Sequence, residues 1–280
     1  MAIGKLITLY LIDGSVNGVI ACELFNWTGK GYKIPRNLLK GVSDREELRK
    51  AGVYFLLGHD ASDQPLAYIG EAEDVYKRLT QHQGKDFWTE ALAFVSKDDN
   101  LNKAHVKYLE YELFREAKEA SRFEIANDNT PNRPGISEAE RSVMLEFAEN
   151  LRVMVGTLGY RVFEPLAKRR AERGDVYLIE ATRGASAKGV LTNEGFVVLK
   201  GSHVAESEVP STPQAVKAKR AALMTDGAIS AFVLCRDILF SSPSIAAAVV
   251  LGRSANGLIE WKLKDGSTLR DAQAPDGGES

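Results

Sequence analysis

The sequence predicts an α/β (α+β) protein built around one compact unit, in which a small mixed or antiparallel sheet is flanked by helices. Two observations predict this class. From residue 52 to about residue 120 the hydrophobic patterns follow the order strand, strand, helix, strand, helix, which is typical of a single α/β unit. The 280 residues exceed what such a unit needs, so we expect a β-rich segment before it and a mixed α/β domain after it.

The first fifty residues predict a β-rich N-terminal segment, residues 1–50. Strands are expected in "LITLYLID", "NGVIACELFNW" and "KGYKIP", and a short helical piece near "DREELRK". The dipeptides Asp13-Gly14 and Asn17-Gly18 supply turn chemistry between the first strands.

The compact unit is expected at residues 51–135. It opens with a hairpin, "GVYFLLGHDASDQPLAYIG", and symmetric pairing about Ala61 would place Tyr54 opposite Tyr68 on one face of the sheet. A helix over residues 73–83 follows, then the strand "ALAFVSK" and a long helix capped by Asn102. The turn-rich "NDNTPNRPGIS" then predicts a boundary or an ordered loop.

Beyond this loop we expect a helical connector, residues 136–175, and a mixed α/β C-terminal domain, residues 176–280. Ser137 and Glu140 have capping-box spacing at the start of the connector helix. In the C-terminal domain, helices are expected in "TPQAVKAKRAALM" and "SPSIAAAVVLG", each with Pro at its first position behind a Thr or Ser cap. The basic run at 217–220, Arg253 and Trp261 are candidates for contact with DNA or a partner, and core packing explains Trp261 equally well.

Composition limits the function classes. The net charge of −2 excludes a globally basic nucleic-acid binder but leaves room for local basic patches. No apolar run approaches the roughly 20 residues that cross a bilayer, so no membrane association is expected and the protein is expected in the cytoplasm. Cys22 and Cys235 are isolated, which predicts neither a zinc site nor a disulfide, and both are expected in the core.

Two pairs of residues near the hairpin are candidates for chemistry. Tyr54 and Tyr68 share a face of the sheet, and the alternative is an aromatic pair that only stabilises two strands. Arg78 and His82 lie four residues apart and therefore share a face of the next helix. The alternative for this second pair is a solvated basic face.

Glu110 is the third candidate, because it falls within an apolar stripe of the long helix. The stripe is formed by Val106, Leu109, Leu113 and Ala117, whereas Glu112, Glu116 and Glu119 are expected on other faces. A buried carboxylate needs a cation or hydrogen bonds. The partner of Glu110 is therefore expected to be either an arginine such as Arg78 or a divalent metal ion. The remaining alternative is that Glu110 lies at the edge of the stripe and is solvated by water.

These residues resemble the GIY-YIG nucleases. The resemblance rests on "GVY" and "YIG" in one hairpin, Arg78 in the following helix and a glutamate in a later helix, and it covers residues 52 to about 132. Arg78 and His82 at R-x-x-x-H spacing are similar to the restriction-enzyme branch of that family, and Val53 departs from its usual Ile. Residues 222–271 resemble the DUF4357 type, a domain found on bacterial GIY-YIG proteins.

The resemblance implies a role for each candidate. Glu110 would bind Mg2+ or Mn2+, Tyr54 would act as general base on water, and Arg78 would hold the scissile phosphate and favour the Tyr54 phenolate. Tyr68 and His82 would position the nucleophile and Tyr54, or relay a proton.

The resemblance also implies contacts with the substrate. An asparagine beyond the glutamate helix would lie near the phosphate, where Asn132 is preferred over Asn129, and a turn asparagine is the alternative. Backbone phosphates could be contacted by lysines that are otherwise merely solvated: Lys77, Lys85, Lys103 and Lys107.

The resulting hypothesis is a divalent-metal-dependent DNA endonuclease that hydrolyses phosphodiester bonds in restriction, phage defence or repair, with a homodimer on DNA as one possible assembly. The alternative is a catalytically inactive nucleic-acid-binding module on the same fold. A third hypothesis is an unrelated α/β scaffold, in which Glu110 pairs with an arginine and no metal binds.

Overall fold

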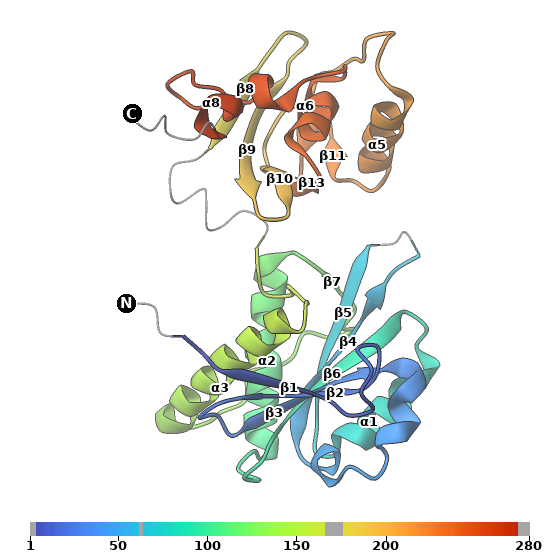
Figure 1. The fold of residues 1–280 in the computed structure, drawn as a ribbon, viewed down its shortest axis with the longest axis vertical. Helices are drawn as coiled ribbons and strands as arrows, with labels where there is room; N and C mark the ends of the chain where they lie inside the picture. The colour runs from blue at the N-terminus through green and yellow to red at the C-terminus, as the bar shows by residue number, and fades with distance from the viewer. Residues whose placement is uncertain (1–3, 62–63, 166–175, 274–280) are drawn as a thin grey trace. The chain divides into compact units, whose positions relative to one another are not determined.

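The computed structural model describes residues 4–61, 64–165 and 176–273. The chain divides into two compact units, residues 1–165 and residues 166–280 (Figure 1). Both units combine helices and sheets, which confirms the α/β class. The end of the expected connector, residues 166–175, lies outside the described residues.

The first unit is organised by a seven-stranded sheet with the order β1-β2-β3-β6-β4-β5-β7. Its strands are β1 (Ile7–Leu11), β2 (Ile20–Leu24), β3 (Gly29–Pro35), β4 (Gly52–His59), β5 (Pro65–Ala72), β6 (Trp88–Ser96) and β7 (Glu124–Ile125). Every neighbouring pair is antiparallel except β5 and β7. Because β3 pairs along its whole length with β6, the N-terminal segment extends the sheet that carries the hairpin.

Helices cover both faces of this sheet. They are α1 (Val75–Gln81), α2 (Lys103–Ala120) and α3 (Glu138–Thr157), with the 3-10 helices η1 (Arg36–Val42), η2 (Glu46–Arg49) and η3 (His82–Gly84). The odd-numbered β4 residues Val53, Phe55 and Leu57 pack with α2 and α3, whereas Tyr54 and Leu56 face α1, η1 and η2. Figure 1 shows α2 and α3 on one side of the sheet and α1 on the other.

The expected hairpin register is wrong by two residues. Tyr54 lies opposite Gly70, and Leu56 lies opposite Tyr68, so the two tyrosines are diagonal neighbours rather than a direct pair. The last pair before the loop is His59 with Pro65, which centres the hairpin one position beyond Ala61. A shift of this kind keeps residue parity, so both tyrosines still share one face.

Two expected helix caps are confirmed. The Asn102 side chain accepts a hydrogen bond from the His105 backbone N–H at the start of α2, and Ser137 and Glu140 form a reciprocal capping box at the start of α3. One expectation for α2 is wrong, because Glu112 is more buried than Glu110. Glu112 is stabilised there by Arg115, whose Nη2 lies 2.6 Å from its carboxylate.

The second unit contains two small sheets and four helices among its described residues. One sheet has the order β13-β10-β9-β8 and the other pairs β11 with β12. The strands are β8 (Tyr177–Glu180), β9 (Ser186–Thr192), β10 (Gly195–Val198), β11 (Ile229–Ser230), β12 (Val233–Leu234) and β13 (Ile238–Phe240). The helices are α5 (Gln214–Thr225), α6 (Pro243–Leu251), α7 (Gly257–Glu260) and α8 (Leu269–Gln273).

Several expectations for this unit are corrected. Ser242 caps α6 as expected, but Thr212 does not cap α5, since its hydroxyl donates to the Gly252 carbonyl instead. Arg220 of the basic run is buried against Glu208 and backbone carbonyls, and Trp261 is fully buried, so packing accounts for both. Cys22 is buried as expected, whereas Cys235 is exposed. In neither unit is any described helix long and apolar enough to cross a membrane.

Candidate active site

The two tyrosines form one wall of a cluster on the α1 face of the sheet. Their ring centroids are 6.1 Å apart with an interplanar angle of 24°, which is a stacked arrangement. Tyr54 is fully buried and Tyr68 is half-buried. Gly70 makes this packing possible, because a Cβ there would collide with the Tyr54 phenol. The final glycine of "YIG" is therefore required by the first tyrosine.

His82 is the direct partner of Tyr54. The Tyr54 hydroxyl lies 2.8 Å from His82 Nε2, and the His82 ring is also packed 5.0 Å from the Tyr68 ring. Burial, together with the charges of Arg78 and Lys85, lowers the pKa of His82 to about 4. A neutral His82 accepts a hydrogen bond from the Tyr54 hydroxyl in the tautomer that carries its proton on Nδ1.

Arg78 acts on Tyr54 in the expected direction, since it lowers the pKa of the phenol, but it does not outweigh burial. Burial, followed by the influence of Tyr68, raises the pKa of Tyr54 far above its ordinary value, and the opposing effect of Arg78 is smaller. Arg78 nevertheless lies beside the cluster, where its guanidinium interacts with both tyrosines. Its Nη1 also donates to Gln81 at 3.1 Å, and the residue itself is exposed. Arg78 is thus exposed beside the two tyrosines, where a ligand can reach it.

Glu110 reaches the sheet from the opposite side, on α2. It is half-buried, and burial followed by the charge of Glu71 raises its pKa to about 7, against smaller effects of Lys107, Arg78 and the Glu71 backbone N–H. Among the described residues Glu110 makes no ion pair, so the expected alternative of a structural pair with Arg78 is not formed.

Glu71 is a charged residue that the sequence reasoning missed. It follows "YIG" directly, and burial raises its pKa as well. A signal was present, because Ala67 and Ile69 are buried against the α2 side of the sheet and strand parity places Glu71 on that same side. An acidic residue at this position of an otherwise apolar strand face therefore lies near Glu110.

The oxygen ligands at this edge of the sheet fit a hard divalent cation. Burial raises the pKa of both carboxylates, and the charge of Glu71 raises that of Glu110 further, so a cation that binds beside them would stabilise their ionised forms. No group of three or more His, Cys, Asp or Glu side chains in the described parts of the chain could hold a metal. This donor set suits Mg2+, which usually keeps several waters and binds through one or two carboxylates.

Comparison with protein families agrees with this geometry. Residues 50–133 match the model of the GIY-YIG catalytic domain. This part of the chain is similar to GIY-YIG catalytic domains. Residues 177–273 match a domain of unknown function, DUF4357. The matched range is wider than the expected residues 222–271 and covers nearly all described residues of the C-terminal unit. Searches of curated proteins and of solved structures found no match.

The lysines predicted to contact phosphate differ in their exposure and in their ion pairs. Lys85 is close to the site, with its Nζ 4.6 Å from the Tyr68 ring centroid. Lys103 is paired with Glu73 at 2.9 Å, which reduces its availability for a phosphate. Lys77 and Lys107 are exposed.

Asn127, which is not among the predicted site residues, bonds to β5, the strand that carries Tyr68. Its side chain accepts from the Ile69 N–H at 3.0 Å and donates to the Ile69 carbonyl at 2.6 Å, so it continues the ladder at the edge of β5. Asn129 and the preferred candidate Asn132 are both exposed. The sequence did not predict this role, because hydrogen bonds from a side-chain amide to the backbone of a residue 58 positions away produce no recognisable sequence pattern.

We expect Asn127→Ala to destabilise the GIY-YIG domain by about 2 kcal/mol, because it removes two hydrogen bonds from the backbone of a buried residue. Urea unfolding followed by circular dichroism measures this change. Asn129→Ala is the matched control and should alter the free energy of unfolding by less than about 0.5 kcal/mol. Equal stability of the two variants would contradict the structural role of Asn127.

Proposed function

We propose that this protein is a divalent-metal-dependent endonuclease that hydrolyses phosphodiester bonds in DNA. The observation that carries the proposal is the hydrogen bond between the buried Tyr54 hydroxyl and the neutral His82 imidazole, beside an exposed arginine. The similarity of residues 50–133 to a family of nucleases supports the reaction class. The carboxylate of Glu110, which has no ion pair among the described residues, supports the dependence on a metal.

The proton route follows from the protonation states of the pair. Tyr54 is protonated before the reaction, so it cannot simply remove a proton from water. As water attacks phosphorus, the Tyr54 oxygen takes the water proton and passes its own proton to His82 Nε2. His82 becomes the imidazolium, the bond between phosphorus and the leaving oxygen breaks, and that oxygen takes a proton from solvent water to become a hydroxyl. Tyr54 is then the base in contact with water, and His82 is the proton acceptor behind it.

Arg78 and Lys85 place positive charge where the phosphate would lie. Arg78 presents a forked donor beside the two tyrosines, a geometry that matches two phosphate oxygens. Lys85 lies against Tyr68 and adds a second charge on the same side. Both charges would also hold down the pKa of His82 until DNA neutralises them, after which His82 accepts a proton more readily.

Glu110 would hold the metal ion, with Glu71 beside it. The ion would supply charge stabilisation for the phosphoryl oxygens during attack. The carboxylate of Glu110 must be ionised to bind it, and the nearby Lys107 and Arg78 favour that state. Lys77, Lys103 and Asn132 stay in the proposal only as peripheral contacts to the DNA backbone.

The test is incubation of the protein with supercoiled plasmid and with single-stranded DNA, in Mg2+ or Mn2+ and in EDTA. Nicking or linearisation that needs the metal, and that the Glu110→Gln variant lacks, is the expected result. Binding of DNA without cleavage under either ion would instead favour an inactive nucleic-acid-binding module. Retained cleavage in EDTA would exclude the metal-dependent mechanism.

The cellular role and the assembly belong to the same proposal. The R-x-x-x-H spacing of Arg78 and His82 favours restriction or phage defence over repair. One active site cuts one strand at a time, so a homodimer on DNA would account for breaks in both strands. Sedimentation of the Glu110→Gln variant on a DNA duplex measures how many copies bind.

A further inference from the structure

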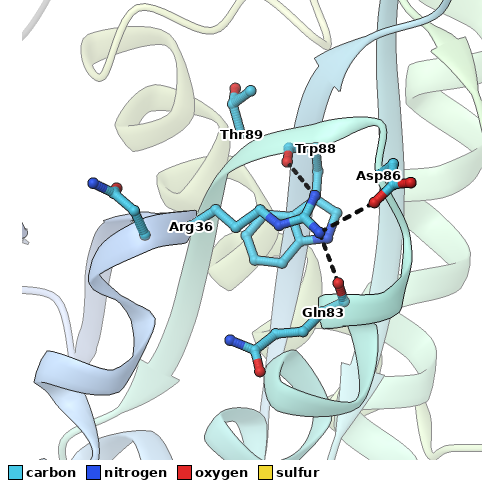
Figure 2. A pocket seen from close by; sticks show the side chains of 6 residues that line it. Arg36, Gln83, Asp86, Trp88 and Thr89 are labelled. Carbon is cyan, nitrogen blue, oxygen red and sulfur yellow. Dashed lines mark hydrogen bonds and ion pairs between the residues drawn. The ribbon is translucent and has the colours of Figure 1, made fainter.

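The N-terminal segment contacts the turn that carries His82. Arg36, at the start of η1, donates from Nη2 to the Gln83 carbonyl at 2.7 Å and from Nη1 to the Trp88 carbonyl at 3.1 Å. Figure 2 shows the guanidinium reaching from η1 to these two carbonyls and to Asp86, which lies 3.6 Å away. Arg36 therefore joins both ends of the segment between η3 and β6.

Trp88 connects this contact to His82 itself. The indole Nε1 donates to the His82 carbonyl at 3.0 Å, and the Arg36 guanidinium lies over the indole ring, 5.0 Å from its centroid. Trp88 is 1% exposed and His82 is 6% exposed, so the hydrogen bond between them lies in the packed interior next to the site. The backbone of His82 is thus held from one side while its Nε2 meets Tyr54 on the other.

We propose that Arg36 and Trp88 are positioning residues that hold the η3 turn so that His82 Nε2 faces the Tyr54 hydroxyl. The inference rests on the proposed function for its catalytic consequence, but the placement of the imidazole can be measured without any cleavage. It also assigns a task to the N-terminal segment, which lies outside the residues matched to the GIY-YIG catalytic domain.

The donors of Arg36 favour positioning over a grip on DNA. Both terminal nitrogens already bind carbonyls, one face of the guanidinium lies over the indole, and the side chain is only 28% exposed. A hollow of about 580 Å³ opens beside it, lined by Arg36, Asn37, Gln83, Asp86, Trp88 and Thr89. The fully exposed Asp86 at this hollow would repel a phosphate.

The first test records the ring nitrogens of His82 by nitrogen NMR in the metal-free protein. The wild type should show one neutral tautomer with its proton on Nδ1, because Nε2 accepts from Tyr54. Arg36→Gln and Trp88→Phe should each mix the two tautomers and move the two nitrogen signals toward one another. Arg36→Lys, which keeps the charge but cannot bridge both carbonyls, should give an intermediate spectrum.

Arg49→Gln is the matched control. Arg49 also comes from the N-terminal segment, stacks 4.3 Å from the Tyr76 ring centroid and donates to the Ser43 carbonyl, but it makes no hydrogen bond to the described residues of η3. Its spectrum should equal that of the wild type. An unchanged His82 tautomer in Arg36→Gln, or an equal change in Arg49→Gln, would overturn the proposal.

The second test separates positioning from DNA binding by kinetics. Arg36→Gln should lower kcat about tenfold with KM for DNA within about twofold, since a misplaced acceptor slows proton transfer without weakening the grip on DNA. A raised KM with unchanged kcat would mean that Arg36 binds DNA and would overturn the proposal. If the wild type fails to cleave DNA, the proposed function fails, while the tautomer still decides whether Arg36 positions His82.

Discussion

Replacing Glu110 with Gln is expected to abolish cleavage, by about 10³-fold or more, and at the same time to stabilise the metal-free protein at alkaline pH. The amide keeps the shape of the side chain but cannot supply the negative charge that a divalent cation requires. Activity and stability are therefore expected to move in opposite directions at this one position, as they do where a site holds uncompensated charge.

The sign of the stability effect follows from the pKa of Glu110. Its pKa in the folded protein is about 7, above the ordinary 4.5, so the folded state binds the proton more tightly than the unfolded state. The stability that Glu110 contributes is fully present below about pH 4.5 and is lost as the pH rises through 7. After discounting for solvent at this half-buried position, the loss at about pH 8 amounts to about 1–2 kcal/mol.

Urea unfolding in EDTA measures this effect, and plasmid cleavage measures the activity. Glu110→Gln should be more stable than the wild type at about pH 8 and equal to it near pH 4. Glu119→Gln is the matched control, because Glu119 is exposed on the same helix, and it should change neither cleavage nor stability. Cleavage by Glu110→Gln at the wild-type rate would remove Glu110 from the mechanism.

Tyr54→Phe is expected to lower the cleavage rate by about 10²–10⁴-fold while DNA binding persists. The substitution removes one oxygen, and with it both the group that contacts water and the donor to His82. The buried ring still stacks on Tyr68 and still covers Gly70, so the fold should lose only about 1 kcal/mol from the missing hydrogen bond.

Single-turnover cleavage together with a DNA-binding assay tests this expectation. Tyr68→Phe should have a smaller effect, because the Tyr68 ring contacts His82 and Lys85 by packing. Tyr76→Phe serves as the control, since Tyr76 lies on α1 beneath Arg49 and outside the cluster, and its rate should match the wild type. If Tyr54→Phe and Tyr76→Phe cleaved equally well, Tyr54 would not be the base.

The hairpin shows which structural features could be predicted from the sequence and which could not. Its two strands, its polar loop and the shared face of Tyr54 and Tyr68 were predicted because side chains alternate along any strand. The register was not, since it depends on the hydrogen bond from the Asp60 N–H to the Gln64 carbonyl and on the close packing of Tyr54 over Gly70. A register shift of two residues keeps each side chain on its face of the sheet. The shared face of Tyr54 and Tyr68 was therefore predicted correctly, whereas their direct pairing was not.

The burial of the carboxylates on α2 was likewise predicted only in part. Helical periodicity placed Glu110 in the apolar stripe, yet the structure buries Glu112 more deeply and leaves Glu110 half-buried. Glu112 is tolerated because Arg115 reaches it, whereas Glu110 lies near Glu71 of a different element. Periodicity reports which face a residue occupies but not what packs against that face.

By itself the sequence determined the order of strands and helices between residues 52 and 120, the caps at Asn102 and Ser137, and the shared face of Tyr54 and Tyr68. These follow from local patterns, whose geometry depends on neighbours a few residues away. Only the tertiary structure decided that His82 bonds to Tyr54, that Asn127 bonds to the edge of β5 and that Arg36 bonds to the η3 turn. Each of these contacts joins residues at least 28 positions apart, where packing rather than local pattern selects the partner.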